Sequence, residues 1–136
     1  NKAPPGNRPK NQQLSRPSIL VVDDEQTILD EVAEYLRSNG YEVATAIDGI
    51  EALALQQSEP SDFVVTDLNM PNMDGRKLLR ELHKLDPPLR VIVVTGHTNF
   101  GEDQKIKADG ASLVLKKPLS LRKLREALES SSILDC

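Results

Sequence analysis

Acidic residues follow two short apolar runs that lie far apart in this sequence. Asp23 and Asp24 come directly after the run at 18–22, and Asp67 comes directly after the run at 62–66. If these three carboxylates share one cleft, they raise one another's pKa and destabilise the cleft unless a cation neutralises them. Oxygen ligands of this kind suit a hard ion such as Mg²⁺ or Mn²⁺, which keeps several waters that a phosphate can replace.

A hydroxyl and an amine stand at equivalent places in two later runs. Thr95 ends the fourth run, and Lys117 follows the fifth, at 112–116. Because side chains alternate along a strand, we expect Lys117 to point inward and Lys116 outward. A metal, an ammonium and a hydroxyl could together stabilise the charge of a transferring phosphoryl group. Asp67 could then act as a carboxylate nucleophile that becomes an acyl phosphate.

The elements that would position these groups follow a regular order. Five runs, several of them rich in Val and Ile, are too short for helices and are predicted strands: 18–22, 42–46, 62–66, 90–95 and 112–116. Segments with helical apolar spacing lie between them. This pattern predicts an α/β fold with a five-stranded parallel sheet, helices on both faces and right-handed crossovers, in which ligands bind beyond the carboxyl ends of the strands.

One predicted helix fits this scheme less well than the others. Residues 99–109, "NFGEDQKIKAD", contain few apolar side chains. A helix buries its apolar stripe against the core, and this segment has little stripe to bury. We therefore expect a short or loosely packed fourth helix.

Composition divides the chain into a tail and one domain. Residues 1–17 are rich in proline, carry four basic residues and no acid, and are predicted to be a flexible tail or linker. Residues 18–136 hold 13 basic and 21 acidic residues, a formal −8, which argues against direct nucleic acid binding by the domain. The single cysteine excludes an internal disulfide, and no run is long enough for a membrane span. The expected location is the cytoplasm.

Four motifs in order resemble the receiver domain of two-component response regulators. They are "VVDDE" after the first run, "DLNMPNMDG" at the third, "VVTG" at the fourth and "GASLVLKKP" around the fifth. The resemblance covers residues 18–133 and leaves 134–136 as a C-terminal end. It implies the flavodoxin-like, doubly wound strand order 2-1-3-4-5.

The resemblance also implies a role for each residue of the site. It implies a phosphoacceptor, two acids and a backbone carbonyl that bind Mg²⁺, a switch hydroxyl, a phosphate-contacting lysine and a cis-proline: Asp67, Asp23 and Asp24, Asn69, Thr95, Lys117 and Pro118. The phosphoryl donor it implies is a sensor histidine kinase or a histidine phosphotransfer domain. A homodimer would use the face formed by the fourth helix, fifth strand and fifth helix.

Two positions differ from the common family pattern, and two more stand where the family tunes the phosphoryl lifetime. Val114 stands where the family usually has an aromatic residue that swings inward with the threonine, and Gly96 replaces a common alanine after Thr95. Transmission from Thr95 to the surface of the fourth helix and fifth strand would then be weaker or would use backbone movement of the loop. Asn69 and His97 occupy positions that in the family tune the lifetime of the phosphoryl group.

Two other functions use related residues. Haloacid-dehalogenase-like phosphatases also combine an aspartate nucleophile with Mg²⁺, threonine and lysine, but Asn69 cannot exchange a proton as their second aspartate does. A degenerate receiver would serve only for docking, and such modules usually lack a key acid or the lysine. We therefore expect a phosphoacceptor signalling domain and not an enzyme. It could be a single-domain regulator, part of a hybrid kinase, or an excised piece of a longer protein.

Overall fold

The structure of the chain is a computed structural model that describes residues 17–70, 73–96 and 98–134. The predicted tail at 1–17 and the predicted C-terminal end at 134–136 lie almost wholly outside these ranges. His97, expected to modulate phosphoryl lifetime, also lies outside the described residues.

Five strands alternate with five helices along the described chain. The strands are β1 (Ser18–Val22), β2 (Glu42–Ala46), β3 (Phe63–Asp67), β4 (Arg90–Thr95) and β5 (Leu113–Lys116). The helices are α1 (Gln26–Ser38), α2 (Gly49–Ser58), α3 (Gly75–Leu85), α4 (Phe100–Ala108) and α5 (Leu121–Leu134). Three strand boundaries differ from the prediction, because β3 is shifted by one residue, beginning at Phe63 and ending at Asp67, and β5 begins one residue later, at Leu113.

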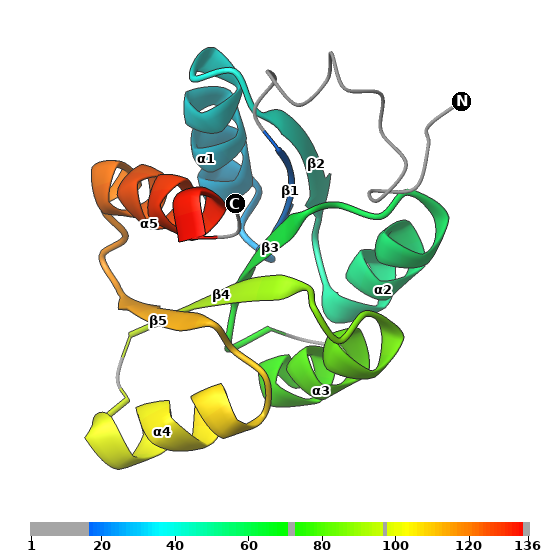
Figure 1. Cartoon of the computed structure of the whole chain (residues 1–136), viewed down its shortest axis with the longest axis vertical. Helices are drawn as coiled ribbons and strands as arrows, with labels where there is room; N and C mark the ends of the chain where they lie inside the picture. The colour runs from blue at the N-terminus through cyan, green and yellow to red at the C-terminus, as the bar shows by residue number, and fades with distance from the viewer. Residues whose placement is uncertain (1–16, 71–72, 97, 135–136) are drawn as a thin grey trace.

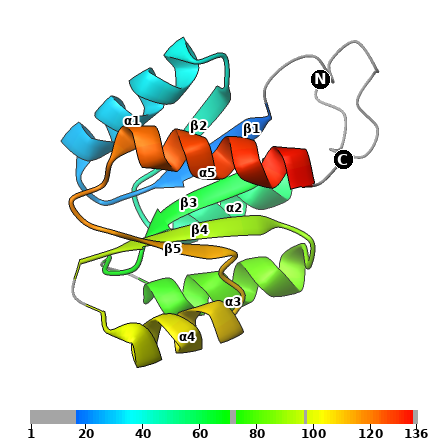
Figure 2. The same cartoon turned by 60° about the vertical axis from the view of Figure 1, so that its left-hand side comes forward.

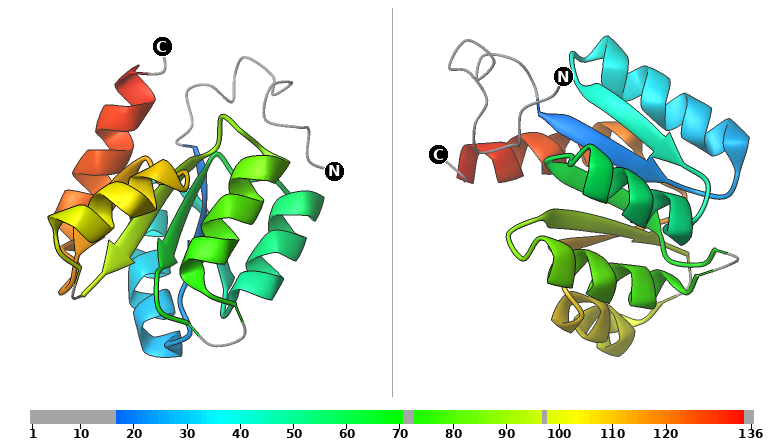
Figure 3. Two further views of the ribbon diagram at one scale, coloured as in Figure 1. Left: turned by 90° about the horizontal axis from the view of Figure 1, so that it is seen from below. Right: turned by 90° about the vertical axis from the view of Figure 1, so that its right-hand side faces the viewer.

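The strands form one parallel sheet in the order β2-β1-β3-β4-β5, as the resemblance implied (Figure 1). Helices α1 and α5 cover one face, and α2, α3 and α4 cover the other (Figure 2). Figure 3 shows the same three layers from two further sides. The doubly wound α/β architecture expected from the sequence is therefore confirmed.

The central strands are apolar throughout because both of their faces are covered. Every residue of β1 and β3 is buried, and alternate side chains enter opposite cores. Val64 packs with Leu79 in the core under α2, α3 and α4, whereas Val65 packs with Leu29 in the core under α1 and α5. Each such buried side chain contributes roughly 1.5–3 kcal/mol, so the two cores fix the strand register from both sides.

The loops at the carboxyl ends of the strands are held by side-chain caps. Asp48 caps α2 through the Glu51 N–H, and Asp74 caps α3 through the Arg76 N–H. Such caps satisfy N–H groups that have no partner within the helix. The caps therefore fix where the helices start beside the site.

Helix α4 is short and weakly packed, as the sequence predicted. Its N-terminus has a capping box in which Asn99 and Glu102 bond reciprocally. Along the helix, however, Ile106 is the buried residue. Hydrophobic contact therefore holds α4 to the core mainly at one side chain.

None of the helices in the described part of the chain combines the length and apolar character that a membrane span requires.

Candidate metal and phosphoryl site

The sheet order brings the carboxyl ends of β1 and β3 together. Val22 pairs with Thr66, so the residues that follow these two positions leave the sheet side by side. Asp23, Asp24 and Asp67 can each offer a carboxylate oxygen such that all these atoms lie within 4.8 Å of one another. The predicted convergence of three acids at this edge of the sheet is present in the structure.

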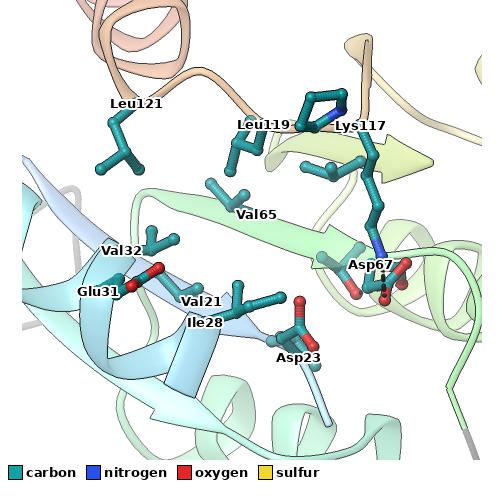
Figure 4. Close-up of a pocket in the computed structure, with 14 residues that line it drawn as sticks. Val21, Asp23, Ile28, Glu31, Val32, Val65, Asp67, Lys117, Leu119 and Leu121 are labelled. Carbon is teal, nitrogen blue, oxygen red and sulfur yellow. Dashed lines mark hydrogen bonds and ion pairs between the residues drawn. The ribbon is translucent and has the colours of Figure 1, made fainter. Parts of the chain in front are cut away.

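Asp67 is buried, and both of its carboxylate oxygens have partners. Its Oδ1 accepts a hydrogen bond from the Asn69 backbone N–H at 3.2 Å. Its Oδ2 accepts one from Lys117 Nζ at 3.0 Å, and Figure 4 shows the lysine reaching down from the loop after β5 to the acid. A charge-assisted bond of this kind is stronger than a neutral one, and it sets the orientation of the carboxylate.

The loop that carries Lys117 is tied to the neighbouring strand. The Lys117 backbone N–H donates to the Thr95 carbonyl at 2.8 Å. The peptide bond between Lys117 and Pro118 is cis. The lysine therefore enters the site from a segment anchored directly beside Thr95, and its side chain points inward.

The acids are electrostatically unequal. Burial raises the pKa of Asp23 above its ordinary value of 3.8, although a hydrogen bond from the Glu25 N–H opposes this. The negative charge of Asp67 raises that pKa further. Burial acts to lower the pKa of the Lys117 ammonium, but its hydrogen bond and attraction to Asp67 outweigh burial and raise the pKa above 10.5. The charged form of Asp23 is thus disfavoured by burial and by the neighbouring Asp67.

This donor set fits a small hard cation. Every side chain of the cluster offers oxygen, two of the acids are buried, and Asp24 is exposed at the mouth. An ion held by one or two carboxylates with several waters suits such a half-open cluster. Burial first, and then the negative charge of Asp67, raise the pKa of Asp23, and a bound cation would offset both effects. The Asn69 backbone N–H donates to Asp67. The role of the Asn69 carbonyl as a further metal ligand stays a prediction.

Thr95 lies at the end of β4 with its hydroxyl uncommitted. The residue is 1% exposed, and its Oγ1 has no hydrogen-bond partner among the described residues. Buried polar groups without a partner are uncommon, and they are costly unless another state or ligand satisfies them. A hydroxyl in this condition is available to an anion that arrives beside it.

The positions that depart from the family pattern have ordinary surroundings. Val114 is half-buried and packs against the core under α2, α3 and α4. Gly96 follows Thr95, and a Cβ built there would meet nothing within 4 Å. Space is therefore available for the loop after Thr95 to move.

Gly75, the first residue of α3, has a steric role that sequence reasoning missed. A Cβ at Gly75 would lie 2.2 Å from the Leu68 carbonyl oxygen, which accepts the Gly75 N–H at 3.1 Å. This close approach closes the loop after Asp67 back onto the strand end. The signal in the sequence was the glycine itself, which permits an approach that any side chain would block.

An apolar cavity of about 290 Å³ opens beside the acids. Figure 4 shows Val65, Ile28 and Leu121 around it, with Asp23 and Asp67 at one end and Glu31 at its rim. The apolar walls lower the local dielectric next to the carboxylates. This strengthens the charge interactions of the site.

The geometry defines the class of protein: a flavodoxin-like α/β domain whose strand ends carry three acids, an amine and a hydroxyl that has no partner among the described residues. The sequence profile of the response regulator receiver domain matches residues 19–129 of the chain. The chain belongs to this family, whose members are two-component signalling domains that generally take phosphoryl on an aspartate and bind Mg²⁺.

Two relatives agree with this placement. A response regulator receiver protein of Anaeromyxobacter sp. (strain Fw109-5) is 37% identical over 105 residues, 77% of this chain and 44% of that protein. The sensor histidine kinase RcsC of Escherichia coli (strain K12) is 38% identical over 110 residues, 81% of this chain and 12% of that protein. The chain thus spans less than half of the length of either relative.

Solved structures share the fold closely. A CheY-like receiver domain protein from Methanospirillum hungatei JF-1 matches with a TM-score of 0.81 and 34% identity over 86% of this chain and 94% of that one. The chemotaxis protein CheY4 of Vibrio cholerae matches with a TM-score of 0.80 and 33% identity over 85% of this chain and 98% of that one. The match spans nearly the whole of each of these two solved chains.

Proposed function

We propose that this domain accepts a phosphoryl group on Asp67 from a phosphohistidine and changes conformation in response. The observation that carries the proposal is the arrangement around Asp67: two further acids whose oxygens lie within 4.8 Å, and an ammonium 3.0 Å away. A carboxylate held between a cation site and an amine is suited to attack phosphorus, because both neighbours offset the charge that builds up there.

The proposed transfer forms one bond and breaks one. A carboxylate oxygen of Asp67 bonds to phosphorus, the phosphorus–nitrogen bond of the phosphohistidine breaks, and the imidazole nitrogen keeps the electron pair and takes up a proton from solvent. Mg²⁺, or Mn²⁺ in its place, would be held by Asp23, Asp24 and Asp67 and would supply charge neutralisation. Lys117 would follow the phosphoryl oxygens as its ion pair with Asp67 is replaced.

The new acyl phosphate would present oxygens to the buried hydroxyl of Thr95, which has no partner among the described residues. Satisfying that hydroxyl favours a state in which Thr95 and the loop after it have moved, so phosphorylation shifts the population of conformations. We expect the shift to reach the face made by α4, β5 and α5, where Phe100 is 76% exposed, and to govern a homodimer or another partner there.

The donor would be a sensor histidine kinase or a histidine phosphotransfer domain, and the expected location is the cytoplasm. Steady hydrolysis of a phosphomonoester would instead favour the phosphatase alternative. That reaction needs a second proton-transferring group, and Asn69 cannot serve as one.

Incubation with a small phosphodonor such as acetyl phosphate, with and without Mg²⁺, tests the proposal by intact mass. The wild type should gain one phosphoryl group only with the metal, and Asp67→Asn should gain none. Asp86→Asn is the matched control, because Asp86 ends α3 at the other end of the sheet and should leave the modification unchanged. Equal modification of the wild type and Asp67→Asn would remove Asp67 from the acceptor role.

A further inference from the structure

Lys116 makes a compact set of contacts that sequence reasoning did not anticipate. Its Nζ donates to the Thr98 carbonyl at 2.8 Å and to Asp103 Oδ1 at 2.9 Å, and it also bonds the Thr98 hydroxyl. An ammonium has three donor positions, so these acceptors can satisfy all of them. The ammonium of Lys116 is therefore held by acceptors of the protein and not by water alone.

The acceptors of this contact set also bond each other. The Thr98 hydroxyl donates to Asp103 Oδ1 while it accepts from Lys116. The hydrogen bond from Thr98, followed by that from Lys116, lowers the pKa of Asp103 below its usual value. The carboxylate, the hydroxyl and the ammonium thus stabilise one another as a closed triangle, here called the Lys116 clamp.

The clamp lies directly beside the free hydroxyl of the site. Thr95 and Lys116 are paired residues of β4 and β5, so their side chains leave the sheet on the same face. Thr98 is three residues after Thr95, on the loop that leads to α4. The clamp therefore fastens that loop to β5, which β4 separates from β3 and Asp67.

Among the described residues, apolar packing fastens this part of the chain only weakly. Ile106 is the buried residue of α4, and a side chain at Gly96 would meet nothing within 4 Å. At its far end α4 is followed by Asp109, which bonds Arg76 of α3 at 2.7 Å. Because apolar packing is sparse, polar contacts at the two ends decide where α4 and its leading loop sit.

We infer that Lys116 is a positioning residue, which holds the loop after Thr95 in its present arrangement through Thr98 and Asp103. The inference rests on the proposed function and adds a restraint on the movement of the loop, made by residues of this chain. In the clamped state the Thr95 hydroxyl has no partner among the described residues. The proposed function expects Thr95 and the loop after it to move when Asp67 is phosphorylated, and this movement would strain or open the clamp.

Neutralising either charge should therefore make the phosphorylated arrangement easier to reach. Lys116→Met keeps the length of the side chain and removes the ammonium, and Asp103→Asn removes the opposite charge. Partly exposed charged hydrogen bonds of this kind are modest in strength, so the rate of phosphorylation by acetyl phosphate should rise about fivefold in each variant. The double variant should gain little more than either single one, because both remove the same interaction.

Two readouts separate this inference from the proposed function. The first is the phosphorylation rate measured by intact mass, with Lys105→Met, an exposed lysine of α4, as the control that should match the wild type. The second is amide hydrogen exchange of the unphosphorylated protein. Exchange in residues 98–103 should be several-fold faster in Lys116→Met and Asp103→Asn and unchanged in α5.

The outcomes are distinct. If the wild type takes no phosphoryl group, the proposed function fails, and the exchange data alone decide whether the clamp holds the loop. If the wild type is phosphorylated but Lys116→Met and Asp103→Asn react at the wild-type rate or slower, Lys116 does not hold the loop against the reaction. Lys116→Arg keeps the positive charge, so it should be phosphorylated at the wild-type rate if the clamp depends on that charge. A merely structural role would not produce a faster reaction.

Discussion

At the residue scale, the chemistry of the site depends on how unevenly its buried charges are compensated. Asp67 has an ammonium at 3.0 Å, whereas Asp23 accepts a backbone N–H from Glu25 at 2.9 Å. Burial and the negative charge of Asp67 together raise the pKa of Asp23. The ionised form of Asp23 therefore costs folding free energy whenever no cation is bound.

The substitution Asp23→Asn should stabilise the metal-free protein at pH 7 by on the order of 1 kcal/mol, because it removes a poorly compensated charge and keeps an oxygen for the Glu25 N–H. A carboxyl whose pKa is raised on folding favours the fold below its unfolded value and loses that contribution as the pH rises through the raised value. The advantage of the variant should thus disappear below about pH 3.8.

Urea unfolding of both proteins at pH 7 and at pH 3.5, with a chelator present, measures this difference. Asp30→Asn on the exposed side of α1 is the control and should change stability little at either pH. A lower unfolding free energy for Asp23→Asn at pH 7 would contradict the electrostatic account of the cluster.

The substitution Lys117→Met should separate metal binding from phosphoryl transfer. Lys117 competes with a cation for the Asp67 carboxylate, so its removal should raise Mg²⁺ affinity severalfold. It also removes the charge that would follow the phosphoryl oxygens, so phosphorylation should slow by tenfold or more.

Calorimetric titration with Mg²⁺ and the acetyl phosphate rate measure the two effects, with Lys123→Met of α5 as a control. A parallel loss of metal affinity and rate would indicate that Lys117 acts through structure alone.

At the element scale, much of the fold could be predicted because the sheet is buried on both faces. Its strands appear as continuous apolar runs, and the predicted ranges match β1, β2 and β4 at both ends. The acids could be predicted as neighbours because parallel strands end at one edge. The clamp could not be predicted, because it depends on the register that places Lys116 opposite Thr95 and on a loop conformation beyond it.

The weak packing of α4 can be tested at Ile106, its single buried residue. Ile106→Ala should destabilise the protein by about 2–4 kcal/mol, and α4 should open locally before the rest of the domain because little else packs it to the core. Amide exchange should accelerate most in residues 100–108. Leu79→Ala, in the same core, is the comparison and should affect the domain as a whole. Uniform acceleration in Ile106→Ala would mean that α4 is not a separate unit.

At the scale of the whole molecule, the strand order β2-β1-β3-β4-β5 turns residues spread from position 23 to position 117 into one site. The two cores on either side of the sheet hold these strand ends in place. A cation bound at the edge therefore links the ends of β1 and β3. Its binding free energy should appear as stability of the entire domain.

Adding Mg²⁺ should therefore raise the free energy of unfolding, by about 1.4 kcal/mol at ten times its dissociation constant. Removing the metal with a chelator should reverse the gain. Thermal unfolding across a Mg²⁺ series measures the effect, and Asp23→Asn should respond much less than the wild type. Equal responses from the two proteins would place the ion elsewhere.

The central claim is that Asp67 itself becomes the acyl phosphate. Borohydride reduces an acyl phosphate to an alcohol, so reduction after incubation with acetyl phosphate and Mg²⁺ should convert the aspartate at position 67 to homoserine, which peptide mass mapping can locate. We predict homoserine at position 67 only when donor and metal are both present. Homoserine at position 23 or 24, or an unaltered Asp67 in protein that carries a phosphoryl group, would contradict the account.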